Sequence, residues 1–230
     1  MTRPGARLAG RVWTWSFGSR PSAPEPARLV ESQICRARFR EHWRRCLNGP
    51  MTLYALGEER PRIHPEAYIH PQAVLIGEVR IGARSSIWPG VIIRADNGPI
   101  VIGARTSVQD GAVIHTQWKL QTRIGDDCVI GHLAHLEGCL LEDLVLVGSG
   151  SVVLEGVVCR SGSLVGAGAV VSPGTEVPAG AMALGVPARI RPGTVEPESV
   201  RINAEAYSTR HLPQHRDGSH EVSLAECLEV

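Results

Sequence analysis

Large aromatic side chains are scarce in this 230-residue chain, where Phe, Trp and Tyr together make up 4% of the residues. A conventional layered core uses more large rings than that, so the composition favours a fold built from short aliphatic strands. The net charge is only +1, which gives no general attraction to nucleic acid or to anionic lipid. No apolar run approaches the roughly 20 residues of a membrane-spanning helix. The N-terminus also lacks an apolar segment followed by a cleavage site, so we expect a cytoplasmic protein without a nucleic acid or membrane partner.

Cysteine pairs with a recognised spacing are missing as well. None of the six cysteines forms a C-x-x-C pair, which argues against a zinc ribbon or a thioredoxin motif. Their spacing does not resemble the disulfide framework of a small secreted domain. We therefore expect reduced thiols, with Cys128, Cys139 and Cys159 filling space in a core.

Composition divides the chain into three zones. Residues 1–50 carry ten Arg against three Glu, and form either a disordered extension from a misassigned start or a basic targeting arm. Residues 51–192 hold a repeat, and residues 193–230 are predicted to form a C-terminal helix and a frayed tail. The helix is expected over 198–207, where apolar residues recur at helical spacing, and the polar chain from His211 onward is expected to be frayed.

The central zone repeats every six residues, with an aliphatic residue at the first position and a small residue four places later. Ile81, Ile87, Ile93, Ile102 and Val108 start such hexapeptides, and the pattern continues to about residue 190. A coil of three hexapeptides places the aliphatic side chains inside a narrow prism, and stacked coils pair as parallel strands. The alternative, a βαβ fold, needs helical stretches between its strands, and none is found between 63 and 190. The sequence predicts an all-β parallel β-helix with a short C-terminal α-helix.

Polar side chains interrupt this repeat at a few positions. They occupy neighbouring coils, which suggests one shared site, because polar groups on sheet faces need partners. These residues are Arg94, Asp96, Gln109, Asp110, His115, His132, His135 and Glu137. Five further histidines are predicted to lie on the surface, namely His64, His70, His211, His215 and His220.

Three motifs in this set resemble the γ-class carbonic anhydrase family. They are the run from Ser86 through Arg94-Ala-Asp96, the run Ser107-Val-Gln-Asp-Gly-Ala-Val-Ile-His115, and Ile130-Gly-His132. The resemblance covers about residues 51–207 and corresponds to the subclass with short loops. The combination of motifs is specific, whereas the repeat alone is shared with many acyltransferases.

The resemblance implies a left-handed β-helix and a homotrimer with one zinc, iron or cobalt ion at each subunit interface. His115 matches one ligand, and His132 matches the ligand contributed by the neighbouring chain. The family's third ligand is a histidine at the position of Glu137 here. Either Glu137 binds directly, which gives an acceptable His, His, Glu set for zinc, or His135 takes the role, or the site is weak or empty.

The implied reaction is the reversible hydration of CO2 to bicarbonate by a metal-bound hydroxide. In the family the residue at the position of Gln109 hydrogen-bonds this group, and a neutral amide suits the task because it both donates and accepts. Arg94, Asp96 and Asp110 match residues that pair around the interface, where they either take part in catalysis or only hold the trimer together. The acidic loops that help to move protons in prototype members are replaced by short segments here, so hydration is expected to be slow.

Two other functions stay open. A hexapeptide acyltransferase would use a histidine as general base and bind CoA between coils. A catalytically silent trimer would only act as a scaffold, and the Glu137 departure keeps that alternative open.

Overall fold

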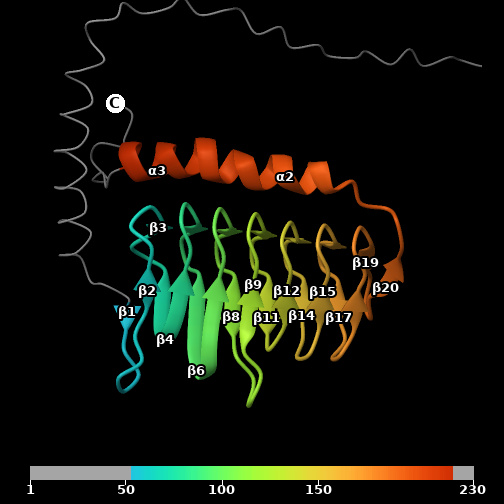
Figure 1. Ribbon diagram of the computed structural model, residues 1–230, viewed down its shortest axis with the longest axis horizontal. Helices are drawn as coiled ribbons and strands as arrows, with labels where there is room; N and C mark the ends of the chain where they lie inside the picture. The colour runs from blue at the N-terminus through green and yellow to red at the C-terminus, as the bar shows by residue number, and fades with distance from the viewer. Residues whose placement is uncertain (1–52, 220–230) are drawn as a thin grey trace, which may run out of the picture. The chain divides into compact units, whose positions relative to one another are not determined.

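The computed structural model describes residues 53–219, so the predicted basic extension and the last eleven residues lie outside the described part. The described chain is a parallel β-solenoid of about seven turns followed by a helical segment, which confirms the predicted fold class (Figure 1). Apart from β4 (Val74–Ile81) and β6 (Ile92–Ile102), which each run across two faces, strands of two or three residues alternate with tight corners, as the six-residue period predicts.

Each turn of the solenoid adds strands to three faces. The first face contains β1 (Leu53–Tyr54), β8 (Val113–His115), β11 (His135–Glu137), β14 (Val152–Val153) and β17 (Val170–Val171), and the first halves of β4 (Val74–Ile81) and β6 (Ile92–Ile102). The second face contains β2 (Arg62–Ile63), the second halves of β4 and β6, β9 (Thr122–Ile124), β12 (Leu140–Leu141), β15 (Val158–Cys159) and β18 (Glu176–Val177). The third face contains β3 (Tyr68–Ile69), β5 (Ser86–Ile87), β7 (Ser107–Val108), β10 (Val129–Ile130), β13 (Leu146–Val147), β16 (Leu164–Val165) and β19 (Met182–Leu184), with β20 (Arg189–Arg191) pairing antiparallel at its end.

The register stacks like residues from coil to coil. Leu146 pairs with Leu164 and Val152 with Val170, a separation of 18 residues that corresponds to three hexapeptides. Ile93, Ile114 and Leu136 stand in register on the first face and are fully buried. Burial of such side chains is worth about 25 cal/mol per Å² of apolar surface, so the column of aliphatic residues is the main stabilising feature. Cys128, Cys139 and Cys159 are buried free thiols in this core, as predicted.

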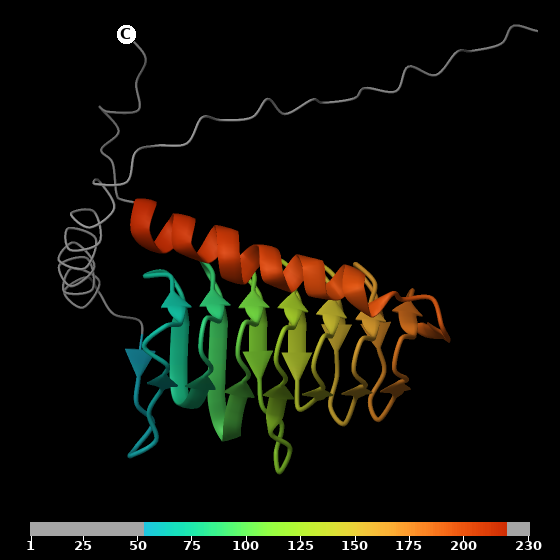
Figure 2. The same ribbon diagram turned by 45° about the horizontal axis from the view of Figure 1, so that its top comes forward.

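The third face is covered by the C-terminal helical segment (Figure 2). This segment consists of α2 (Pro197–Ala206), the π-helical turn η1 (Tyr207–His211) and α3 (Leu212–Gly218). Val200, Ala204 and Leu212 are buried against the coil. The prediction of a frayed chain after His211 was therefore wrong for residues 212–218, because burial of Leu212 extends the packed face by two more turns. Pro213 is the second residue of α3, in the first turn, where its missing N–H is tolerated.

The part of the chain from 53 to 219 contains no helix that is both long enough and apolar enough to cross a membrane.

Candidate functional site

Five of the predicted site residues gather on the first face, on three adjacent strands. Arg94, His115 and Glu137 are Cα partners in successive coils, so their side chains project side by side from β6, β8 and β11. Asp96 forms an ion pair with Arg94 and lies 2.7 Å from Nε2 of His115 through its Oδ1. His135 completes the set, which we call the face cluster.

His115 lies between two carboxylates. Its Nε2 faces Asp96, and its Nδ1 lies 3.2 Å from Oε1 of Glu137. A neutral imidazole carries a single N–H and can donate to only one of these groups. The other nitrogen then directs its lone pair toward an oxygen lone pair, an arrangement that a bound cation would relieve. The side chain is only 15% exposed, so water screens this repulsion poorly.

Asp96 is held in its charged form. Burial would raise its pKa, but the hydrogen bond from His115 and the positive charge of Arg94 outweigh burial, and the pKa lies below the ordinary value. A carboxylate that stays ionised is a suitable acceptor for an imidazole N–H, and this contact fixes the orientation of the ring.

His135 and Glu137 project from the same side of β11. They are separated by Leu136, which is fully buried, and alternation along a strand places residues two apart on one face. Nε2 of His135 lies 3.4 Å from Oε2 of Glu137. Alternation along β11 therefore does not show which of the two is the ligand, because both side chains lie on the same side of the strand. Register does distinguish them, since Glu137 stands directly beside His115 and His135 does not.

The other predicted residues form a second group, the corner cluster, where the third face turns into the first. His132 lies in the turn before β11, and its Nδ1 is 3.1 Å from Oδ2 of Asp110. Both side chains are about half exposed. Because Asp110 occupies Nδ1, the other ring nitrogen of His132 is left for a ligand contact.

Gln109 belongs to the corner cluster and lies near the helical segment. The residue is only 6% exposed, and its side-chain amide is close enough to Tyr207 of η1 to affect the pKa of the phenol. Burial raises the pKa of Tyr207, the charge of Asp110 adds to this effect, and the amide of Gln109 opposes it in part. The signal for this proximity in the sequence was that Tyr207 follows apolar residues at helical spacing.

Rings pack around this contact, and they include histidines that were predicted to lie on the surface. Trp88 contacts Tyr207 at a ring-centroid distance of 6.1 Å and His215 at 4.9 Å. His70 is also part of this group through Tyr68. His215 is exposed, as predicted, although its ring packs edge-on against Trp88. His70 is only partly exposed, because the surface prediction did not include the covering helix.

Ser107, which stands two residues before Gln109, supports Trp88 and does not join the corner cluster. The Trp88 indole N–H donates to Oγ of Ser86 and of Ser107, each at 3.0 Å. This buried contact satisfies the indole and fixes the ring beneath Tyr207.

The face cluster and the corner cluster do not meet within one chain. No hydrogen bond or ion pair joins them in the described region, and among residues 53–219 no group of three or more His, Cys, Asp or Glu side chains is arranged to hold a metal ion. Within one copy the predicted residues form two groups, because stacking aligns residues on one face and not residues on a face with those at a corner. The donor types nevertheless fit a divalent cation if two copies contribute them.

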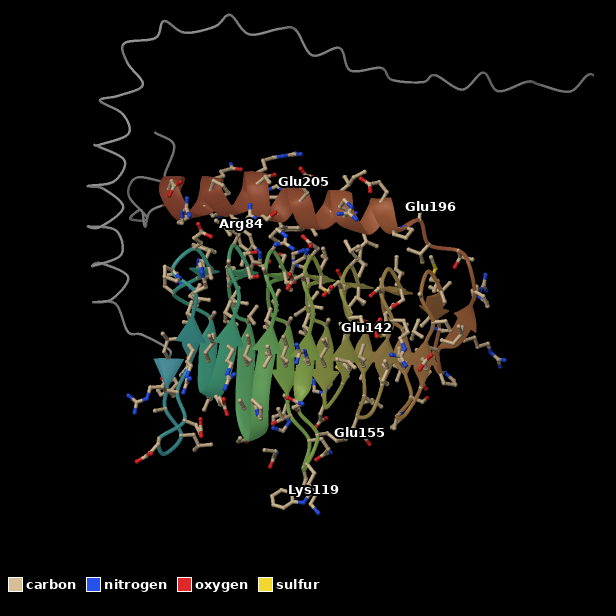
Figure 3. The ribbon with its side chains drawn as sticks, viewed as in Figure 1. Arg84, Lys119, Glu142, Glu155, Glu196 and Glu205 are labelled. Atoms are coloured by element: carbon tan, nitrogen blue, oxygen red, sulfur yellow. The ribbon has the colours of Figure 1, made fainter. Side chains whose placement is uncertain are left out.

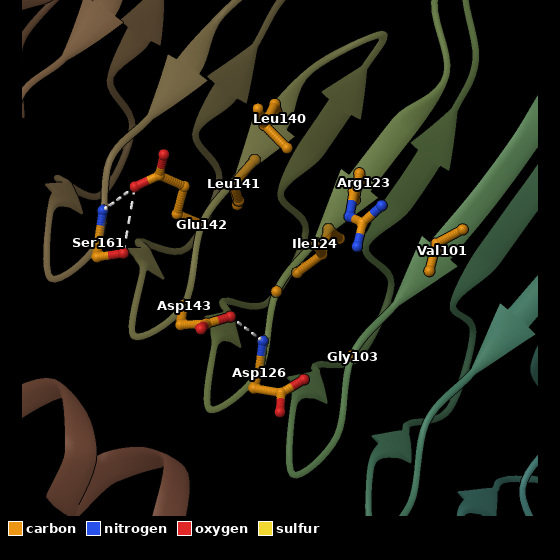
Figure 4. A pocket seen from close by; sticks show the side chains of 11 residues that line it. Val101, Gly103, Arg123, Ile124, Asp126, Leu140, Leu141, Glu142, Asp143 and Ser161 are labelled. Atoms are coloured by element: carbon orange, nitrogen blue, oxygen red, sulfur yellow. Dashed lines mark hydrogen bonds between the residues drawn. The ribbon is translucent and has the colours of Figure 1, made fainter.

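The structure also has a shallow hollow of about 330 Å³ on the second face (Figure 4). Arg123, Leu140 and Glu142 line it, and none of the predicted site residues does. It is therefore separate from the candidate site.

These features place the protein in the class of hexapeptide-repeat β-solenoids, with one polar cluster on a face and one at a corner. The family described as "Bacterial transferase hexapeptide (six repeats)" matches residues 60–95. Gamma carbonic anhydrase 1, mitochondrial, of Arabidopsis thaliana is 35% identical over 212 residues, which cover 90% of this chain and 76% of the relative. Gamma carbonic anhydrase 2 of the same plant is 34% identical over 88% of this chain and 73% of its own length. The chain belongs to the γ-carbonic anhydrase family of hexapeptide-repeat proteins.

Other relatives have different names. The carnitine operon protein CaiE of Citrobacter koseri is 35% identical over 68% of this chain and 81% of its own. Among solved structures, a hexapeptide transferase family protein from Anaplasma phagocytophilum is 33% identical with a TM-score of 0.66, covering 68% of this chain and 94% of that one. A putative acetyltransferase from Bacillus cereus is 32% identical with a TM-score of 0.66, covering 71% and 94%.

Proposed function

We propose that this chain is a metalloprotein that hydrates CO2 reversibly to bicarbonate at sites shared between the copies of a homotrimer. The observation that carries the proposal is the separation of the donors within one copy. His115 and Glu137 stand side by side on the first face, whereas His132 lies half exposed at a corner. In the proposed trimer, a face of one copy and a corner of the next bring these donors together.

His115 and Glu137 of one copy and His132 of the next would hold the ion, with His135 as the alternative to Glu137. Zinc, iron and cobalt all accept such a set of imidazole and carboxylate donors. When bound, the ion would lower the pKa of a coordinated water to about 7 and so supply a nucleophile for CO2 near neutral pH.

The surrounding residues of this chain orient the donors. Asp110 lies 3.1 Å from Nδ1 of His132, and Asp96 accepts a hydrogen bond at Nε2 of His115, so a carboxylate orients each ring. Gln109, a buried residue of the corner cluster, offers an amide that can donate to a bicarbonate oxygen. No acidic side chain occurs between Thr116 and Leu120, so proton removal depends on solvent and turnover is slow.

The test is metal analysis and stopped-flow CO2 hydration of the purified full-length protein. We expect about one ion per chain and measurable hydration. His115→Ala and His132→Ala should each lose both, because each removes a donor from a shared site. His64→Ala is the matched control, since His64 is exposed and contacts only the Glu66 backbone N–H. A protein without metal and without hydration activity would refute the proposal.

A second candidate, CoA-dependent acyl transfer, is favoured by the names of the two solved relatives with TM-scores of 0.66. A thermal-shift titration with CoA and a turnover assay with acetyl-CoA separate it from hydration. We expect no shift and no turnover. A CoA-dependent rise in melting temperature that survives His132→Ala would favour the transferase.

A further inference from the structure

A small hairpin projects from the solenoid immediately after the face cluster. Gln117 and Leu120 pair across a two-residue turn, with backbone hydrogen bonds of 3.2 and 2.8 Å. Lys119 adopts a left-handed conformation at φ 66°, and Figure 3 shows it at the tip, on the side of the solenoid opposite α2. The hairpin begins two residues after His115, at the corner between the first and second faces.

The base of this hairpin is fixed to the coil. The Thr122 hydroxyl donates to the backbone carbonyl of His115 and accepts the Gly138 N–H at 2.9 Å. Gly138, at φ +59°, leaves room for the hairpin, because a Cβ there would lie 3.0 Å from that of Gln117. The hairpin is therefore a defined extension of the site and not a free loop.

Two large apolar side chains next to the candidate ligands lack cover. Trp118 is 71% exposed on the hairpin, and Leu133 is 71% exposed in the turn directly after His132. An exposed tryptophan is an unusual feature of a surface that contacts only water, and such rings are enriched at interfaces between proteins.

We infer that the hairpin of one copy packs on the Leu133 turn of the next copy, with Trp118 forming the outer wall of the shared site. The inference rests on the proposed function, because bringing His132 of one copy to His115 of another also brings Leu133 toward Trp118. The charges near the two exposed side chains are complementary, which favours a second copy of this chain as the partner. Lys119 is basic, and Asp110, whose carbonyl accepts the Leu133 N–H at 3.0 Å, is acidic.

The wall has a chemical consequence for the site. An indole that covers the opening removes water from around the donors, which strengthens their interaction with a cation. It also supplies no group that can carry a proton, in keeping with slow turnover.

Cysteine cross-linking tests the contact directly. Trp118→Cys and Leu133→Cys are combined in the full-length chain, with Cys35, Cys46 and Cys227 changed to Ser and the buried cysteines retained. A short bismaleimide should convert the double variant into covalent trimers on a denaturing gel, because each copy offers one thiol to each neighbour. The matched control pairs Trp118→Cys with Ile202→Cys, since Ile202 is 60% exposed on α2 and should give no trimers.

The outcomes separate this inference from the proposed function. Covalent trimers in the first pair alone support the contact. A metal-containing trimer that stays uncross-linked, or that cross-links through Trp118→Cys alone, overturns the inference and leaves the proposed function intact. A metal-free monomer overturns both.

A double-mutant cycle provides a second measurement by sedimentation. Trp118→Ala and Leu133→Ala should each raise the concentration at which the trimer dissociates by about tenfold, and the double variant should add little. Full additivity of the two changes would contradict direct contact. Trp118→Ala combined with Ile202→Ala is the control pair that should be additive.

Discussion

At the scale of single residues, the candidate site depends on what stands beside His115. Asp96 and Glu137 face its two nitrogens, so the ring is placed to exchange one carboxylate contact for a bond to a cation. Glu137 occupies the place where the family resemblance implies a histidine. Strand register alone leaves His135 on the same side, and the direct pairing of Glu137 with His115 favours Glu137 as the donor.

Substitutions at these two positions should distinguish the donors. Glu137→Ala should weaken zinc binding by more than about 100-fold because it removes a ligand, whereas Glu137→His should retain binding. His135→Ala should cost about tenfold or less, as expected for a residue that only contacts a ligand. Isothermal titration of the zinc-free protein measures all three, and the reverse order would assign the role to His135.

The residue between them has a different task. Leu136 is fully buried in the core column, so Leu136→Ala should lower the free energy of unfolding by about 2–5 kcal/mol. Leu136→Met preserves volume and should cost less than about 1.5 kcal/mol. Urea denaturation followed by circular dichroism measures both, and equal effects would show that this core position tolerates a cavity.

At the scale of elements, the helical segment both covers the third face and reaches the corner cluster. Tyr207 of η1 and His215 of α3 both pack against Trp88. His70 contacts the same group of rings through Tyr68, and its Nδ1 accepts the Gln72 N–H at 3.2 Å, which requires an unprotonated nitrogen. The Gln72 contact thus depends on a neutral His70 ring.

This dependence predicts an effect of pH. Burial lowers the pKa of His70, the charge of Asp110 opposes this in part, and His215 lowers it further. Because the folded-state pKa is below the unfolded value of about 6.5, the unfolded chain binds more protons between these values. Stability is fully present above about pH 6.5 and is lost as the pH falls toward the folded-state pKa.

Melting temperatures at pH 7.5 and pH 5.0 test this prediction. The wild type should melt at a lower temperature at the lower pH. His70→Asn keeps an acceptor for the Gln72 N–H without a titrating ring, so it should show a smaller loss. A loss of the same size in both proteins would place the sensitivity elsewhere.

At the scale of the whole molecule, the proposed site makes metal binding and association a single equilibrium. Donors that lie on a face and at a corner of one copy meet only between copies, so an ion that binds the trimer must stabilise it.

Sedimentation with and without a chelator measures this coupling. Addition of zinc should lower the concentration at which the trimer dissociates by at least about tenfold, and chelation should reverse the effect. His132→Ala should abolish the response to zinc. His64→Ala should leave it unchanged, and a zinc response that survives His132→Ala would contradict the shared site.

The sequence by itself determined the solenoid and its inventory of donors. An aliphatic residue every six positions can be buried in only one way, so the period predicted the coils, the column through Ile93, Ile114 and Leu136, and the buried thiols. Motif spacing likewise selected the residues from Arg94 to Glu137. The tertiary structure decided which of these residues meet, because a corner and a face of the same coil point in different directions whatever their separation in sequence. It also decided that the helix continues to Gly218 and covers Gln109, since that outcome depends on burial against strands more than 70 residues away and not on local propensity.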